Sequence, residues 1–142
     1  SFKGEILSGI HALGTTVIRA GTGADTLKAA LYLASATINA ATTAYTVTGE
    51  VSGAGYSAGG VTVTNATAPT TGGTTGYWTP SASITYTTVT LTTAFDCVLI
   101  YNSTQSNKAI SAHTFGSQTV TAGTFTLTMP VNDASNALIR IA

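Results

Sequence analysis

The sequence predicts an all-β protein, an antiparallel β-sandwich of jelly-roll type with about eight strands and a short N-terminal helix. Two observations indicate the sandwich. Apolar and polar residues alternate with a period of two along most of the chain after residue 26. Glycine, asparagine, threonine or proline separates most of these alternating segments. The length of 142 residues, with no break in composition, predicts a single domain over 1–142.

The helix is predicted at the N-terminus, where the periodicity differs. Four apolar residues of the segment 2–13 recur every three or four positions and share one helical face: Phe2, Ile6, Ile10 and Leu13. Gly4 and Gly9 weaken this helix by up to about 1 kcal/mol each relative to alanine. We therefore expect a short helical arm within residues 1–13 that needs tertiary support.

The first half of the predicted sandwich contains three strands and a long loop. In the segment 26–35, one face carries Leu27, Ala29, Leu31 and Leu33, and the other carries Lys28, Ala30 and Tyr32. Residues 44–48 and 61–65 alternate in the same way. Residues 66–80 are predicted to be an irregular polar loop because of Pro69, Gly72, Gly73, Gly76 and Pro80. Tyr77 and Trp78 near its end either anchor the loop on the core or face a partner.

The second half is predicted to contain five more strands. In 84–91 the apolar positions shift phase between Tyr86 and Val89, which indicates a β-bulge. Residues 96–101 are continuously apolar after Asp96, so we expect a central strand covered on both faces. Strands at 108–115 and 123–130 follow. In the latter Phe125, Leu127 and Met129 face inward, the threonines face outward and Pro130 ends the strand. Residues 136–142 form the last strand.

The low charge of the chain excludes several classes of partner. Only 7% of the residues are charged, against about 25% in an ordinary domain. Five acidic and five basic residues balance, so the net charge is zero. Nucleic acids and anionic membranes require a strong field of one sign. We therefore expect neither as a partner, whereas a neutral, threonine-rich surface favours association with other proteins.

The cysteine content and the apolar runs predict the compartment. Cys97 is the single cysteine, so no disulfide forms within the chain, and we expect synthesis in a reducing cytoplasm. No charged segment followed by an apolar run opens the chain, so no signal peptide is predicted. No apolar run approaches the roughly 18 residues that would span a bilayer. Without secretion, the glycosylation patterns at Asn65 and Asn102 have no role.

A glycine-rich segment resembles a dinucleotide-binding turn but lacks its context. Residues 53–58 read G-x-G-x-x-A, with four glycines between Gly53 and Gly60. A dinucleotide turn opens a helix and is followed by an acidic residue about twenty positions later. Here a β pattern follows, and no Asp or Glu lies between Glu50 and Asp96. We therefore interpret the glycines as positive-φ positions of a loop, and the glycines of 20–25 likewise.

No combination of residues predicts catalysis or a metal site. His11 and His113 have no neighbouring ligand, and Cys97 lies in the most apolar segment, where a thiol behaves as a small hydrophobe. No G-x-S-x-G elbow is present. The five carboxylates are scattered, most of them beside turns or strand ends: Glu5, Asp25, Glu50, Asp96 and Asp133. We expect no enzyme activity, catalytic residue, cofactor, metal or small-molecule substrate.

Several longer segments resemble a recurrent family of small virion proteins of tailed bacteriophages. The similar segments are LYLASATI (31–38), EVSGAGYSAGG (50–60), LIYNST (99–104) and SNALIRI (135–141), and the opening FKGEILSGIH is similar too. The resemblance covers most of residues 27–142. One departure is AFDCVLIYN (94–102), where relatives tend to carry an Arg-Gly turn, which puts only that local turn in doubt.

The resemblance implies a structural role in the virion. It implies a cement or decoration protein on the capsid exterior, made in the host bacterial cytoplasm, that binds the major capsid protein. Because oligomers tend to be symmetric, we also expect the chain to bind itself as a homodimer. Two alternatives stay open at this stage. One is a protein of the tail tube or tail fibre. The other is a carbohydrate-binding module for host attachment, in which Tyr56, Tyr77 and Trp78 would stack on sugar rings.

Overall fold

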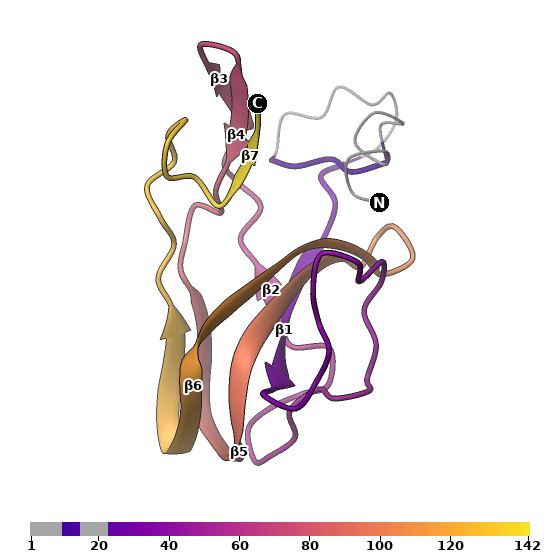
Figure 1. The fold of residues 1–142 in the computed structure, drawn as a ribbon, viewed down its shortest axis with the longest axis vertical. Coiled ribbons are helices and arrows are strands. Elements are labelled where there is room, and N and C mark those ends of the chain that lie inside the picture. The colour runs from indigo at the N-terminus through magenta and orange to yellow at the C-terminus, as the bar shows by residue number, and fades with distance from the viewer. Residues whose placement is uncertain (1–9, 15–22) are drawn as a thin grey trace.

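The computed structural model describes residues 10–14 and 23–142, which contain seven strands and no helix. All strand pairs are antiparallel. A four-stranded sheet has the order β2-β1-β5-β6, and a three-stranded sheet has the order β3-β4-β7. Figure 1 shows the smaller sheet beyond one end of the larger one. The predicted all-β, antiparallel class is confirmed. The strands are β1 (Leu27–Leu33), β2 (Val61–Val63), β3 (Thr70–Gly72), β4 (Thr75–Trp78), β5 (Ile84–Asn102), β6 (Lys108–Leu127) and β7 (Ile139–Ile141).

The two faces of β1 are those that the alternation predicts. Leu27, Ala29 and Leu31 lie in the main core, whereas Ala30 and Tyr32 lie in a second apolar cluster. All five side chains are 0% exposed. Since successive side chains of a strand point to opposite faces of the sheet, β1 is covered on both sides.

The ribbon formed by β5 and β6 dominates the fold. The sequence predicted four strands at 84–91, 96–101, 108–115 and 123–130, but the structure contains two continuous strands of 19 and 20 residues. The predicted bulge is confirmed, because the register shifts between Tyr86 and Val89, and Thr88 has a φ of 53°. Further shifts follow as far as Cys97, and one more lies between Ile100 and Tyr101. Bulges bend a ribbon without ending it, and Figure 1 shows β5 and β6 folding back on themselves.

The second half of β5 is the central strand that the apolar run predicts. It pairs with β1 on one side and with β6 on the other. Val98 and Ile100 belong to the main core, and Leu99 belongs to the second cluster. An element between two strands and two apolar clusters has no solvent-facing side, which explains the absence of alternation.

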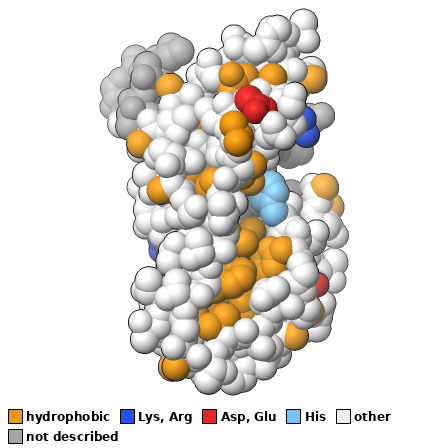
Figure 2. Space-filling model, turned by 90° about the vertical axis from the view of Figure 1, so that its left-hand side faces the viewer, with side chains coloured by type: hydrophobic (Ala, Val, Ile, Leu, Met, Phe, Trp, Pro, Cys, Tyr) orange, Lys and Arg blue, Asp and Glu red, His pale blue; other side chains and the backbone are white. Residues whose placement is uncertain are grey.

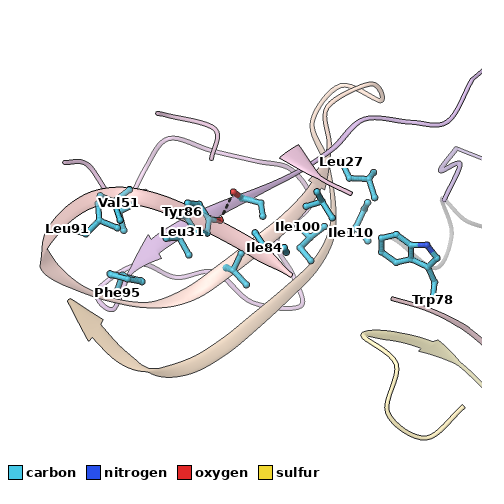
Figure 3. Packing of buried hydrophobic residues seen from close by; sticks show 14 residues of the cluster. Leu27, Leu31, Val51, Trp78, Ile84, Tyr86, Leu91, Phe95, Ile100 and Ile110 are labelled. Carbon is cyan, nitrogen blue, oxygen red and sulfur yellow. Dashed lines mark hydrogen bonds between the residues drawn. The ribbon is translucent and has the colours of Figure 1, made fainter. Parts of the chain in front are cut away.

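The main core lies inside the bend of the ribbon. Figure 3 shows Leu91, Phe95 and Tyr86 around Leu31 and Val51 there. Tyr86 is 1% exposed and donates its hydroxyl to the carbonyl oxygen of Ala29 at 2.8 Å. Complete burial of side chains of this size contributes roughly 1.5–3 kcal/mol each.

The segment 66–80 is not the irregular loop that its composition predicted. It contains the hairpin of β3 and β4, with Gly72 paired to Thr75 and Gly73 at a φ of 61° between them. A two-residue connection of this kind accepts glycine at positive φ. Trp78 is 1% exposed and donates its indole N–H to the carbonyl oxygen of Thr67 at 2.8 Å. Of the two interpretations of Trp78, the anchor on the core is confirmed.

Three other predictions concern the two ends of the chain and one loop. Residues 44–48 form no strand, and only Ala44 makes an isolated bridge, to Lys108. The segment packs on β1 through a side chain instead, since Tyr32 donates its hydroxyl to the carbonyl oxygen of Thr46 at 2.6 Å. Residues 1–9 of the predicted helix lie outside the described residues, and residues 10–13 are not helical. The final strand is shorter than predicted, over Ile139–Ile141.

Candidate functional site

The glutamate at the start of the glycine-rich loop is the centre of a hydrogen-bonded group, here called the Glu50 cluster (Glu50, Tyr45, Tyr56 and Gly59). The hydroxyl of Tyr45 donates to Oε2 at 2.7 Å, and that of Tyr56 donates to Oε1 at 2.7 Å. The backbone N–H of Gly59 donates to Oε1 at 2.8 Å. The carboxylate therefore closes the loop on itself, and both its oxygens are engaged.

The Glu50 cluster also fastens the loop to the large sheet. Val51 donates its N–H to the carbonyl oxygen of Leu31 at 3.0 Å, and Leu31 donates its own N–H to the Tyr56 hydroxyl at 3.0 Å. Tyr101 donates its hydroxyl to the carbonyl oxygen of Gly59 at 2.8 Å. The loop thus crosses β1 and β5 and covers them.

The glycines of this loop are explained by backbone contact. A Cβ at Gly60 would lie 1.7 Å from the carbonyl oxygen of Ala29, and one at Gly53 would lie 2.0 Å from that of Thr90. Gly55, Gly59 and Gly60 have positive φ, as the sequence predicted for this loop. The loop leads into β2 and not into a helix. The segment therefore packs on the sheet and has no helix N-terminus for a phosphate.

The tyrosines around Glu50 are held in their neutral form. Burial raises the pKa of Tyr32 to about 12. Burial, and then the hydrogen bond to the Glu50 carboxylate, raise the pKa of Tyr45 and of Tyr56 far above 10. A general acid or base needs a pKa near the working pH, so these phenols are suited to donating hydrogen bonds and not to proton transfer.

A second polar group, here called the Asp25 cluster (His11, Asp25, Asn65, Asn102 and Gln105), lies at the start of β1. Asp25 is 3% exposed, although its place beside a turn predicted a solvated or capping carboxylate. Its Oδ2 accepts from Asn102 Nδ2 at 2.7 Å and from the N–H of Ala12 at 2.7 Å. The Nδ2 of Asn102 also lies 3.0 Å from Nδ1 of His11. Burial of a charge is tolerated where hydrogen bonds surround it, and this cluster ties residues 11–12 to the sheet.

The two asparagines that match the glycosylation pattern belong to this cluster. Asn102 is 0% exposed, and its Oδ1 accepts from the N–H groups of Thr104 and Gln105, both at 3.1 Å. Asn65 donates to the carbonyl oxygens of Asp25 at 2.8 Å and Ala12 at 3.2 Å. Both side chains therefore serve the fold.

The remaining nucleophilic and titratable candidates lie apart from one another. Cys97 is 4% exposed, and burial raises the pKa of its thiol, as expected of a small hydrophobe. His113 contacts Ser111 Oγ at 2.9 Å, and burial lowers its pKa. The hydrogen bond from Asn136, followed by those from the N–H groups of Ser135 and Asn136, lowers the pKa of Asp133, which caps its own turn. The structure brings none of these three groups into the Glu50 or Asp25 cluster.

The residues proposed for sugar stacking are differently placed. Trp78 is buried, and the hydroxyl of Tyr56 is bound to Glu50. Tyr77 is half-buried on β4. Only Tyr77 is left as part of an aromatic platform, and a single ring gives little surface for a glycan.

Within residues 10–14 and 23–142, no three His, Cys, Asp or Glu side chains are grouped so that they could hold a metal ion. The same residues contain no helix with the length and hydrophobicity needed to cross a bilayer. A shallow depression of about 130 Å³ lies between the loop 39–43 and residues 109–112 of β6. It is smaller than the cavities of roughly 300–1,000 Å³ that hold small-molecule ligands.

The exposed threonines of the β5–β6 ribbon are here called the threonine array. Ten threonines of these two strands are exposed, and Thr85 Oγ1 lies 3.4 Å from Thr126 Oγ1 across the strands. Hydroxyl groups form hydrogen bonds to a protein partner without the desolvation cost of ions. The array consists of Thr85, Thr87, Thr88, Thr92, Thr93, Thr114, Thr119, Thr121, Thr124 and Thr126.

Comparison of the chain with protein-family models, with curated proteins and with solved structures gives no match. The resemblance to bacteriophage virion proteins therefore stays a prediction from the sequence.

Proposed function

We propose that this chain is a non-enzymatic structural protein of a tailed-bacteriophage virion, a cement protein that binds the major capsid protein on the capsid exterior and stabilises the head. The observation that carries the proposal is an exposed ribbon surface that is rich in threonine and poor in ions. The threonine array covers the longest strands. A cement protein needs area and stiffness and no reaction centre.

The few charges support this interpretation because several of them are used inside the chain. Among the four acidic residues that the structure describes, Asp25, Glu50 and Asp133 accept hydrogen bonds within their own clusters or turn. Arg140 donates to the carbonyl oxygen of Ser135 at 2.6 Å. Partners are then selected by shape, hydrogen bonds and apolar contact, as in interfaces that bury about 1,600 Å².

The finer description of the fold belongs to the same proposal. We expect the two sheets to form a sandwich of jelly-roll type, with about eight strands and a helical arm at the N-terminus. An experimental structure of the chain bound to capsids tests this description and locates the protein on the particle.

The experiment is deletion of the gene, followed by heating of the particles and by addition of the purified chain. We expect the heads without the chain to release DNA at a lower temperature than complete heads, and the added chain to restore them. Many weak contacts acting together produce such an effect. Electron microscopy with a labelled chain is the second readout. Copies confined to the tail, or heads equally stable without the chain, contradict the proposal.

A further inference from the structure

The strand β6 forms a long, open edge of the large sheet. In the strand order β2-β1-β5-β6 it is terminal, and it runs over 20 residues. Its first residues are covered, because Ala44 bridges Lys108, and Ala109 donates its N–H to the carbonyl oxygen of Thr43 at 2.9 Å. Beyond Ala109, no strand within the described part of the chain pairs with its outer side.

This edge lacks the usual protection of edge strands. Natural edges carry charged side chains, above all lysine, to prevent pairing with another chain. From Ala109 to Asn132 the sequence contains no Asp, Glu, Lys or Arg. The bulges of the ribbon bend β6 in its middle, but they leave its C-terminal end regular. In this part of the strand, here called the C-terminal limb, Phe125–Leu127 pair with Ile84–Tyr86. A partner strand therefore meets a neutral and regular edge at this limb.

An apolar row runs along the same limb and past its end. Phe125, Leu127 and Met129 are partly buried against the core, and Val131 is 69% exposed. The centroid of the Phe125 ring lies 5.5 Å from that of Phe115 and 5.0 Å from that of Phe95, so Phe125 packs in an aromatic group at the core. Figure 2, viewed from the side where β6 lies in Figure 1, shows hydrophobic side chains gathered in a hollow.

We infer that two copies of this chain pair antiparallel through residues 123–129, which are the last five residues of β6 and the two that follow it, about a two-fold axis at Thr126. In this register Phe125 lies opposite Leu127 of the second copy, and Thr124 lies opposite Thr128. Directly opposite residues of an antiparallel pair share a face of the sheet. The apolar row thus meets itself on one face, and the threonine pair Thr85–Thr126 continues across the axis on the other.

A second copy fits this edge because of charge and pattern. A strand with ions would lose their hydration against an edge that offers no opposite charge. The chain's own segment 123–129 is uncharged and alternates between threonine and apolar residues from Thr124 onward. A two-fold interface must be self-complementary, and the register about Thr126 satisfies that condition at each pair.

The strength of the dimer follows from the length of the seam. Seven residues span about 23 Å in a strand, and a seam of this length buries less surface than the roughly 1,600 Å² of a standard stable interface. We therefore expect a weak dimer with a Kd of about 1–100 µM, in rapid exchange with the monomer. Such a dimer forms in solution and does not depend on the virion role. Either proposal can therefore be refuted without refuting the other.

The test is sedimentation equilibrium of the purified full chain, from about 0.5 to about 500 µM, a range that brackets the expected Kd. We expect the mass to rise with concentration from the 14.2 kDa of one chain toward twice that value. Thr126→Lys places like charges across the axis and should weaken the dimer at least tenfold. Thr85→Lys is the matched control, because Thr85 is also exposed but lies one strand inside the edge.

A charge-exchange experiment tests the register itself. Thr126→Lys and Thr126→Glu should each dimerise at least tenfold more weakly than the original chain when alone, and should regain dimerisation when mixed in equal amounts. Circular dichroism checks that each variant is folded, as expected for an exposed position. The inference is overturned if the chain stays monomeric at the highest concentration, if Thr126→Lys dimerises like the original chain, or if the mixture does not associate.

Discussion

Removal of the Glu50 carboxylate is the perturbation for which the structure gives the most definite outcome. Glu50→Ala deletes the acceptor of two tyrosine hydroxyls and of the Gly59 N–H, at 2.7, 2.7 and 2.8 Å. A hydrogen bond to a charged group contributes about 1.5–3 kcal/mol. We expect the Tyr45 hydroxyl to bind water instead, whereas the Tyr56 hydroxyl is also held by the Leu31 N–H, so we count only Tyr56 and Gly59. Because Glu50 itself is partly exposed, we take the lower value for each bond and expect a loss of about 3 kcal/mol.

The measurement is equilibrium unfolding in urea, followed by the fluorescence of the single tryptophan, Trp78, which is buried. Glu50→Gln keeps one acceptor oxygen and should lose about half as much free energy of unfolding. Tyr56→Phe should cost more than Tyr45→Phe, because the Tyr56 hydroxyl also accepts the N–H of Leu31. Asp96→Ala removes a carboxylate outside the cluster and is the control. A loss below about 1 kcal/mol for Glu50→Ala would refute this account of the loop.

Three further predictions follow from glycine contacts and pKa shifts. Gly60→Ala, with its Cβ 1.7 Å from Ala29 O at a φ of 71°, should destabilise the fold by more than about 2 kcal/mol in urea unfolding; Gly116→Ala, which meets nothing within 4 Å, should be nearly neutral. Burial raises the pKa of Tyr32 to about 12 and also raises the pKa of Tyr101. Because these phenols lose their protons more readily in the unfolded chain, the free energy of unfolding should be full below about pH 10 and fall above it. Near-ultraviolet absorbance at about pH 11 should show far less phenolate in the folded than in the unfolded chain. Burial lowers the pKa of His113 below 6.5, so as the pH drops the unfolded chain binds this proton before the folded chain does. The free energy of unfolding should therefore fall below about pH 6.5, and urea unfolding of His113→Gln should show a shallower fall. Equal pH dependence in the variant and the original chain would contradict the prediction.

The part of this fold that was predicted from sequence depends on local alternation. The faces of β1, the bulge after Tyr86 and the central strand at Val98–Ile100 each follow from which neighbouring residues are apolar. The hairpin of β3 and β4 was missed because its polar, glycine-rich residues carry no alternation. Its stability comes from pairing with β7, more than 60 residues later in the chain.

The polar clusters were missed for a different physical reason. The Glu50 cluster is local, and the spacing of Tyr45, Glu50, Tyr56 and Gly59 was a signal that the sequence analysis did not use. The Asp25 cluster joins Asp25 to Asn102, 77 positions away. No pattern within a segment reports such a pair, so Asp25 was expected near solvent.

The sequence by itself determined that the chain is β-structured and nearly uncharged, because composition and alternation are properties of the chain. Only the tertiary structure decided that four predicted strands join into one bent ribbon, that the glycines of 53–60 lie against backbone carbonyls, and that β6 leaves an uncharged edge open. Those features depend on which distant segments meet, and their pairing energy arises only when the chain folds.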